Sequence, residues 1–432
     1  MVKKITDKKA HIVAVNMGYG HQRTAYPLRG FAFGGKVINA NDYDGIPEKD
    51  KKVWESSRAF YEFISRFKKV PLIGSLAFAI FNKFQAIPSF YPHRDLSKPN
   101  LTLKKMYSLI HKGWGKDLIS NLKKNPLPFV TSFFVPAFMA EEHNYPGEIY
   151  CIVSDADCAR AWAPLSPQKS KIKYFAPNLW VQNRLKIYGV KPENIFLTGF
   201  PLPLENIGTE KQEILKKDLA SRLLNLDPQK KFFERYQVFL NGSASLLSKR
   251  KDHPLTIMFA IGGAGAQKEM VMEYIKNLIV KIKKEELKII LSAGARKEVD
   301  DYFLEHLKEL KLEKHIGKNI EIVFDENIMD YFINFSKKLR KTDILWTKPS
   351  ELSFYSGLGI PILVAPTIGS QEDYNKRWLA GIGSGVSQID PQYASQWIFD
   401  YLISGRFAEA ALAGFIEVEK LAVYKIAKII FK

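Results

Sequence analysis

One stretch of the chain, residues 343–379, constrains the fold more than any other. Its sequence, DILWTKPSELSFYSGLGIPILVAPTIGSQEDYNKRWL, begins with the short apolar run Asp343–Trp346, which is typical of a buried strand. A polar turn and a short predicted helix, Glu351–Leu358, follow it. After a Gly-Ile-Pro break come a second apolar strand, Ile362–Ala365, a loop and the start of a second helix. This strand–helix–strand–helix order predicts a parallel α/β sheet.

Both strands of this stretch are followed by polar side chains that a hydrophobic core does not need. Those after the first strand are Thr347, Lys348, Ser350 and Glu351, and those after the second are Ser370, Gln371, Glu372 and Asn375. Ligands of parallel sheets bind at the carboxyl ends of the strands, against helix N-termini. A lysine between two helix N-termini suits a diphosphate, and the neighbouring Glu, Gln and Asn side chains suit the hydroxyl groups of a sugar or ribose.

The segment Thr347–Leu379 resembles the donor-binding segment of GT-B glycosyltransferases. It is most similar to the group that contains monogalactosyldiacylglycerol synthase, the processive diacylglycerol glucosyltransferases and the GlcNAc transferase that makes lipid II. Those proteins share a K-x-G turn, a G-[LI]-P strand start and a G-x-Q-E-x-x-N helix start, which here is Gly369–Asn375. The resemblance implies a GT-B fold, in which two Rossmann-like α/β domains face each other across a cleft. It also implies transfer of a sugar from a nucleotide sugar, a UDP-sugar, to a membrane lipid acceptor such as diacylglycerol, with inversion and without a metal.

A glycine-rich turn follows the first predicted strand, His11–Met17. Its sequence is Gly18-Tyr19-Gly20-His21, and we expect a helix to begin near Thr24. Glycines in such a turn let a ligand approach backbone N–H groups. In the family that the chain resembles, a G-x-G-H sequence lies at the same place and its histidine faces the acceptor. The resemblance implies that Gly18 and Gly20 form an acceptor-side loop and that His21 accepts a proton, whereas the plain alternative is a turn histidine that caps or packs.

A second candidate base, Asp155, follows the predicted strand Glu148–Ser154. The sequence Ser154-Asp155 with Trp162 downstream is similar to the V-[TS]-D strand end of the family, but the histidine that the family places between them is missing. Asp155 is thus a candidate for the base or for a group that orients His21, with a helix N-cap as the alternative. Asp155-Ala156-Asp157 also forms a D-x-D pattern, but in the acceptor half of the chain, so we expect no metal.

A second glycine loop follows the predicted strand Leu255–Ile261 and precedes the predicted helix Lys268–Lys283. This loop favours phosphate binding but lacks the Gly-Lys-Ser/Thr ending of a Walker A loop. In the family, a similar G-G-x-G sequence faces the donor nucleotide. The predicted donor-binding residues are therefore Gly262, Gly263, Gly265, Lys348, Ser350, Glu351, Gln371, Glu372 and Asn375. Two departures from the family pattern stand out: Ser350 replaces the glycine of the turn, and Phe354 occupies the position of the glutamate that binds ribose, for which Glu351 is the nearby substitute.

The length of 432 residues and a hydrophobic fraction of 46% predict two domains with real cores. We expect an N-terminal acceptor-side domain over 1–203, a nucleotide-sugar domain over 204–405, and an amphipathic helix over 406–432 that packs back on the first domain. Two cysteines are too few for a disulfide framework or a zinc site, which favours a reducing compartment. We find no signal-peptide pattern and no apolar run of spanning length. The expected location is therefore cytoplasmic, peripheral on the inner face of the membrane.

The net charge of +19 is concentrated in an expected helical insertion at about 50–125. Residues 51–127 hold 15 Lys and Arg against 4 Asp and Glu, and aromatic residues alternate with the basic ones. This pattern favours an anionic membrane surface, with ordinary amphipathic core helices as the alternative. No RNA-binding signature accompanies it, so we do not expect a nucleic-acid partner. Two other functions remain open at this stage, a non-catalytic GT-B relative that binds a sugar nucleotide or lipid and a sugar-nucleotide epimerase, and the oligomeric state is undefined.

Overall fold

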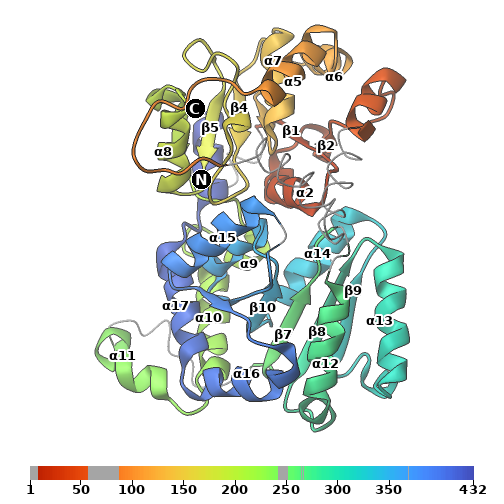
Figure 1. Cartoon of the computed structure of the whole chain (residues 1–432), viewed down its shortest axis with the longest axis vertical. Coiled ribbons are helices and arrows are strands. Elements are labelled where there is room, and N and C mark those ends of the chain that lie inside the picture. The colour runs from red at the N-terminus through yellow and green to blue at the C-terminus, as the bar shows by residue number, and fades with distance from the viewer. Residues whose placement is uncertain (1–7, 57–86, 242–251, 264, 266, 368) are drawn as a thin grey trace, which may run out of the picture. The chain divides into compact units, whose positions relative to one another are not determined.

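The computed structural model describes residues 8–56, 87–241, 252–263, 265, 267–367 and 369–432 (Figure 1). The chain divides into two compact units, which we describe separately. Unit 1 comprises Met1–Pro201, Ile368–Asn375 and Leu421–Lys432, and unit 2 comprises Leu202–Thr367 and Lys376–Lys420. Each unit is built on one parallel sheet.

The sheet of unit 1 has six strands in the order β2-β1-β3-β4-β5-β6, and every pairing is parallel. The strands are β1 (His11–Ala14), β2 (Ile38–Asn39), β3 (Phe129–Thr131), β4 (Ile149–Ile152), β5 (Lys173–Ala176) and β6 (Ile195–Leu197). The α-helices of this part of the chain are α2 (Tyr19–Ala25), α5 (Leu101–His111), α6 (Lys116–Lys123), α7 (Phe134–Glu142), α8 (Leu179–Ile187) and α18 (Ala422–Ile430). Short 3-10 helices span Tyr26–Phe31, Phe33–Gly35, Arg160–Trp162 and Pro192–Asn194.

The sheet of unit 2 also has six strands, in the order β12-β11-β10-β7-β8-β9, and it too is entirely parallel. The strands are β7 (Thr256–Ala260), β8 (Lys288–Gly294), β9 (Ile320–Phe324), β10 (Ile344–Thr347), β11 (Ile362–Val364) and β12 (Gly385–Ser387). The α-helices are α9 (Leu204–Ile207), α10 (Glu213–Leu226), α11 (Lys231–Asn241), α12 (Lys268–Lys283), α13 (Lys297–Glu309), α14 (Ile328–Leu339), α15 (Ser370–Gly381), α16 (Ala394–Ile403) and α17 (Arg406–Glu417), the first residues of α15 being assigned to unit 1. The 3-10 helices are η6 (Glu313–His315), η7 (Glu351–Leu358) and η8 (Pro391–Tyr393).

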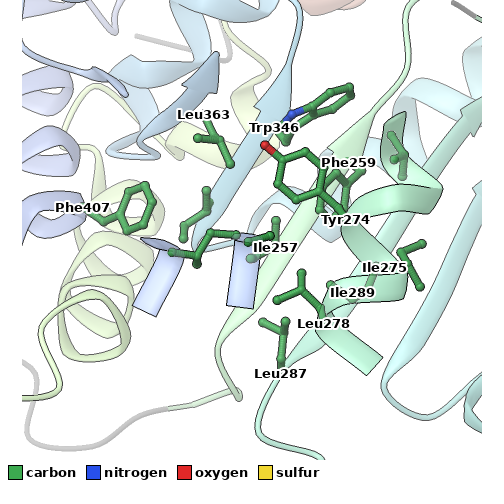
Figure 2. Close-up of a cluster of buried hydrophobic side chains, with 14 of the residues drawn as sticks. Ile257, Phe259, Tyr274, Ile275, Leu278, Leu287, Ile289, Trp346, Leu363 and Phe407 are labelled. Carbon is green, nitrogen blue, oxygen red and sulfur yellow. The ribbon is translucent and has the colours of Figure 1, made fainter. Parts of the chain in front are cut away.

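The core of unit 2 follows from the alternation of side chains along its strands. On one face, Ile257 and Phe259 of β7 pack with Trp346 of β10 and with Tyr274 of α12 (Figure 2). On the other face of β8, the hydroxyl groups of Ser292 and Tyr331 of α14 lie 2.8 Å apart. Strands that are buried on both faces read as continuous apolar runs, which is the pattern that the sequence carries here.

The core of unit 1 contains several aromatic residues of the basic region. Trp54 and Trp114 pack edge to face with ring centroids 4.7 Å apart, and Tyr107 packs on Phe138 at 5.2 Å. Trp54, Tyr107 and Trp114 are buried, whereas Lys104 and Lys105 on the same helix as Tyr107 are exposed. Tyr91 of the same region is 65% exposed. Trp54, Tyr107 and Trp114 are therefore core residues. The other aromatic and basic residues of the proposed membrane surface, Arg58, Phe60, Phe63, Arg66, Phe67, Lys68, Lys69, Phe78, Phe81, Lys83 and Phe84, lie outside the described residues.

A polar network lies at the amino end of β10, opposite to the end that precedes Lys348. Oδ2 of the fully buried Asp343 accepts hydrogen bonds from the backbone N–H of Thr256 at 2.8 Å and from the side-chain amide of Asn225 at 3.1 Å. Nε2 of His253 lies 3.1 Å from Oδ1 of Asp343, and Nδ1 pairs with Asp252. Burial lowers the pKa of His253, but the hydrogen bonds and charges of the two carboxylates outweigh it and raise the pKa above the ordinary imidazole value. Desolvation raises the pKa of Asp343, so both shifts favour retention of a proton in the folded state.

The predicted fold class is confirmed: the chain is an α/β protein with two Rossmann-like parallel sheets. The predicted strands are present, although several are shorter than predicted. Two local expectations were wrong. Helix α2 begins at Tyr19, not near Thr24, so His21 lies inside the helix, and the edge strand β12 was not predicted because it is only three residues long.

Neither cysteine is poised for chemistry, since Cys151 and Cys158 are both buried and free and burial raises the pKa of each thiol. Among the described residues, no helix is long and apolar enough to cross a bilayer.

Candidate functional site

The strand order of unit 2 identifies where a ligand would bind to its sheet. From β7 the chain adds β8 and β9 on one side, then returns to add β10, β11 and β12 on the other. The order reverses between β7 and β10, whose last residues, Ala260 and Thr347, are paired in register. Open parallel sheets bind ligands at such a switch point, beyond the carboxyl ends of the strands.

Two predicted donor residues lie together at this switch point. Gly262 follows β7 by two residues, and Lys348 follows β10 directly. A Cβ atom built on Gly262 would lie only 2.8 Å from Cε of Lys348, so the lysine side chain rests against the bare backbone of the glycine. Any larger residue at 262 must displace the lysine side chain. The absence of a side chain at 262 therefore leaves room for the Lys348 side chain at this edge.

The rest of the glycine loop forms a tight turn before α12. The N–H of Gly265 donates to the carbonyl oxygen of Gly262 at 2.8 Å, and Gly265 has a φ of +67°, a conformation that favours glycine. Gly263 lies within this turn and is partly exposed. The loop is tied to the strand end of β11, because the side-chain amide of Gln267 donates to the carbonyl oxygen of Pro366 at 2.8 Å.

The turn after Lys348 leads into η7. Ser350 is the N-cap residue of η7, and its hydroxyl lies 3.5 Å from the carbonyl oxygen of Lys348. Glu351 begins the 3-10 helix and is buried, with a side-chain exposure of 7%. Phe354 is fully buried and packs on Trp378 with ring centroids 4.8 Å apart, so the position of the family's ribose glutamate is occupied by a core residue.

The switch point of unit 1 lies between β1 and β3, because β2 is added on one side of β1 and β3 to β6 on the other. The loop after β1 contains Gly18 and Gly20. Gly18 is the N-cap of α2 and has a φ of +99°, which a residue with a side chain rarely adopts. The loop is braced by Asn41, whose side chain accepts from the N–H of Asn16 at 2.7 Å and donates to its carbonyl oxygen at 3.1 Å. The predicted acceptor-side loop is thus at the edge where this sheet would bind a ligand.

His21 contacts the end of the neighbouring strand. Its Nδ1 lies 2.9 Å from the carbonyl oxygen of Ser132, the residue after β3. A carbonyl oxygen only accepts, so Nδ1 carries the proton, and in the neutral ring Nε2 keeps a lone pair. The ring also packs on Phe133, with centroids 4.5 Å apart. These contacts fix the tautomer that a proton acceptor requires.

Asp155 follows β4, the next strand of the same sheet, and is half-buried. Its Oδ1 accepts a hydrogen bond from the side-chain amide of Asn375 at 3.1 Å. The amide oxygen of Asn375 in turn accepts from the N–H of Ala156 at 2.8 Å. The structure therefore brings together Asp155 and Asn375, two residues to which the sequence assigned different ligands.

Asp157 has a different surrounding from Asp155, although only one residue separates them. Its carboxylate forms a two-point ion pair with Arg184, with distances of 2.9 and 2.8 Å, and both side chains are almost fully buried. The indole N–H of Trp180 and the N–H of Cys158 also donate to it, each at 2.8 Å. The second aspartate of the D-x-D pattern is therefore a structural residue that ties the loop to α8.

Gln371 and Glu372 lie in the first turn of α15, within the segment Ile368–Asn375 that is assigned to unit 1. Both are half-buried. Gly262, Gly263, Gly265, Lys348, Ser350 and Glu351 belong to unit 2. The predicted donor residues therefore form two groups, one in each unit. Each group lies at or near the carboxyl ends of the strands in the sheet of its own unit.

Sequence reasoning missed Ser132 and Gln267. Ser132 acts through its backbone carbonyl, and any residue type could supply that group. Gln267 reaches Pro366, a residue 99 positions away, and such pairings are set by the packing of the strands. Neither residue carries a local sequence signal.

The chain is similar to several known proteins. The family described as "Domain of unknown function (DUF6938)" matches residues 243–323, a region that contains β7, α12, β8 and α13. No curated protein sequence matches the chain.

Similar solved structures include UDP-GlcNAc 2-epimerase from Neisseria meningitidis bound to UDP-GlcNAc, at 13% identity and a TM-score of 0.47, with 78% of this chain and 84% of the epimerase covered. They also include MurG from Acinetobacter baumannii, at 14% identity and a TM-score of 0.46, with 98% and 99% covered. A glycosyltransferase from Rickettsia africae matches at 12% identity and a TM-score of 0.38, with 78% and 84% covered. Likenesses of this size carry no conclusion about the activity of this chain.

Proposed function

We propose that this protein is a glycosyltransferase that moves a sugar from a UDP-sugar to a hydroxyl group of a membrane lipid. The observation that carries the proposal is the position of Lys348 against Gly262 at the switch point of unit 2. A lysine over a bare backbone, beside the turn that precedes α12, offers a positive charge close to the N-terminus of a helix. A diphosphate is the ligand that this combination suits best.

The proposed reaction is a single in-line displacement. Nε2 of His21 accepts the proton of the acceptor hydroxyl, with Asp155 as the second candidate for that role. The acceptor oxygen forms a bond to the anomeric carbon, and the bond from that carbon to the β-phosphate oxygen breaks. The electron pair leaves with UDP, and the configuration at the anomeric carbon inverts. Lys348 offsets the charge that develops on the diphosphate, which is the role of an electrophilic metal in other enzymes.

The remaining donor contacts are assigned by the resemblance to the monogalactosyldiacylglycerol synthase group. Gly263, Gly265 and Ser350 surround the phosphates, Glu351 replaces the missing ribose glutamate, and Gln371 and Glu372 bind sugar hydroxyls. The lipid acceptor and the peripheral membrane location rest on the same resemblance and on the local charge of the basic region.

Calorimetric titration with UDP tests the donor half of the proposal. We expect micromolar-range binding by the wild type and a loss of about tenfold to a hundredfold in affinity for Lys348→Ala, because a charge-assisted contact contributes about 1.5–3 kcal/mol. Glu372→Ala should weaken binding of the UDP-sugar more than binding of UDP. Lys337→Ala removes an exposed lysine of α14 in the same unit and serves as the control, with unchanged affinity.

Incubation with UDP-sugars and anionic vesicles that contain diacylglycerol tests the transfer half. Release of UDP together with a labelled glycolipid would support the proposal. Conversion of the sugar without an acceptor would identify an epimerase instead, and UDP binding with neither reaction would identify a non-catalytic relative. A wild type that binds no UDP would refute the proposal at its first step.

A further inference from the structure

Asn375 is completely buried, and both ends of its side-chain amide are used. The N–H of Ala156 can only donate, so the group that faces it at 2.8 Å must be the amide oxygen. The amide nitrogen therefore faces Oδ1 of Asp155, at 3.1 Å, where it donates. This reasoning fixes the orientation of the amide from its partners, and the orientation matches an ionised Asp155.

The loop that carries Asp155 is held on both sides. The carbonyl oxygen of Ala156 accepts from the side-chain amide of Asn178 at 3.1 Å, and Asp157 is paired with Arg184. The backbone of the loop is thus fixed by contacts that do not involve the Asp155 carboxylate. The carboxylate itself accepts from Asn375, whose amide oxygen also accepts from the N–H of Ala156. A buried donor aimed at a half-buried carboxylate stabilises its charged form and restricts its rotation.

The same short segment carries the proposed sugar ligands. Gln371 and Glu372 precede Asn375 by one helical turn, and the hydroxyl of the intervening Tyr374 donates to the carbonyl oxygen of Ile87 at 2.8 Å. Asn375 and Tyr374 thus bind the beginning of α15 to two separate loops of unit 1. Asn375 itself has its amide directed at these loops, and a sugar ligand would have to compete with Asp155 for it.

We propose that Asn375 is a positioning residue that holds the Asp155 carboxylate ionised and in a fixed orientation at the carboxyl edge of sheet 1. This inference deepens the proposed function and rests on it for the role of Asp155 in the reaction. The contact itself is independent of the reaction. Asn375 acts through Asp155 and is not a ligand of the donor sugar.

Titration of the Asp155 carboxyl group tests the contact without any activity. In protein labelled with 13C at the aspartate carboxyl carbon, the Asp155 signal is identified by its absence in Asp155→Asn. We expect its titration to move to higher pH by roughly half a unit or more in Asn375→Ala, because the donor that favours the ionised form is lost. Asn375→Asp keeps the acceptor for Ala156 but puts a second carboxylate beside Asp155, so it should produce a larger upward shift.

Asn178→Ser is the matched control. It removes the other amide that braces this loop, retains a side-chain oxygen for the N-cap of α8, and does not touch the Asp155 carboxylate. Its Asp155 titration should equal that of the wild type. Equal titrations in the wild type, Asn375→Ala and Asn375→Asp would overturn the proposal, as would a shift of the same size in Asn178→Ser.

Kinetics separate positioning from donor binding. We expect Asn375→Ala to lower kcat by about tenfold, to move the acid limb of the pH–rate profile to higher pH, and to leave the UDP-sugar affinity within about twofold. In an Asp155→Asn background the same substitution should have no further effect on kcat. A higher donor KM with an unchanged kcat, or effects that add to those of Asp155→Asn, would show that Asn375 binds the donor and would overturn the inference. If the wild type proves to have no transferase activity, the carboxyl titration still decides whether Asn375 controls Asp155.

Discussion

The carboxyl edges of the two sheets use different kinds of groups, although both sheets have six parallel strands and a switch point beside their first strand. At the edge of unit 1, side chains are held by hydrogen bonds from other parts of the unit: His21 by Ser132, and Asp155 by Asn375. At the edge of unit 2, the group that matters is a lysine resting on a glycine. Its position depends on space that a side chain would fill.

Under the proposed function, the contrast corresponds to a division of chemical work. Groups that move a proton need a defined tautomer and orientation, and hydrogen bonds supply both. A group that binds a diphosphate needs charge and access to backbone N–H groups, and small residues supply the access. Each of the following predictions separates one side of this comparison from the other.

Substitution of His21 should have the largest effect, and only on the rate. For His21→Gln we expect a decrease in kcat of about a hundredfold to ten-thousandfold, the range of a lost general base. The UDP dissociation constant should not change, because His21 belongs to unit 1, whereas Lys348 belongs to unit 2. Single-turnover kinetics measures the rate of transfer, and calorimetry measures UDP affinity. A loss of UDP affinity in His21→Gln would contradict the assignment of proton transfer and UDP binding to different units.

The two aspartates of the D-x-D pattern should differ sharply in their effect on stability. Asp157→Ala leaves the buried Arg184 without its carboxylate and should destabilise unit 1 by about 3–5 kcal/mol. Asp155→Ala removes one hydrogen bond to a half-buried carboxylate and should cost about 1 kcal/mol. Urea unfolding followed by the fluorescence of Trp180, which contacts Asp157, measures both. Similar losses for the two variants would refute the structural assignment of Asp157.

Gly262→Ala tests the other edge. A methyl group 2.8 Å from Cε of Lys348 forces the flexible lysine side chain to move, so UDP affinity should fall by about tenfold while the unfolding free energy changes by less than about 1 kcal/mol. Gly381→Ala is the control, because an added Cβ there has no atom within 4 Å and the residue has no positive φ, so UDP affinity should not change. Unchanged UDP affinity in Gly262→Ala would show that UDP binding does not depend on the position of the Lys348 side chain.

The smallest effect concerns pH and the amino end of the unit 2 sheet. Because the folded pKa of His253 is raised, its contribution to stability is fully present below the unfolded value of about 6.5 and is lost as pH rises through the folded pKa. The difference in unfolding free energy between wild type and His253→Gln should therefore decrease above about pH 6.5, by at most about 1.4 kcal/mol per pH unit. If the difference in unfolding free energy between wild type and His253→Gln increased with pH, the pKa of His253 would not be raised by folding.

The sequence predicted the features that are encoded locally. Apolar runs marked the strands, and the Gly-rich turns after β1 and β7 and the polar residues after β10 marked the edges where ligands bind. The contact between Gly262 and Lys348 was not predictable from spacing, because it depends on the pairing of β7 with β10. Their last residues, Ala260 and Thr347, are paired in the sheet although 87 positions separate them in the sequence. The same limit applies to Asn375: its motif predicted a donor ligand, and only the fold reveals that its amide reaches Asp155, 220 positions away. Phe354 entered the sequence analysis only as a departure from the family pattern, and the fold shows that it is a buried core residue.

The division of the chain into units has a consequence for synthesis. Unit 1 begins the chain, yet it requires Ile368–Asn375 and the helix α18, which follow nearly all of unit 2. The ring of Phe431 packs on Phe31 with centroids 5.7 Å apart, and the side chain of Lys8 donates to the carbonyl oxygen of Phe431 at 2.7 Å. As the chain leaves the ribosome, the last helix that unit 2 needs, α17, is made before the last helix that unit 1 needs. The unit that starts first is therefore completed last, and until then its apolar surface depends on other protection in the cell.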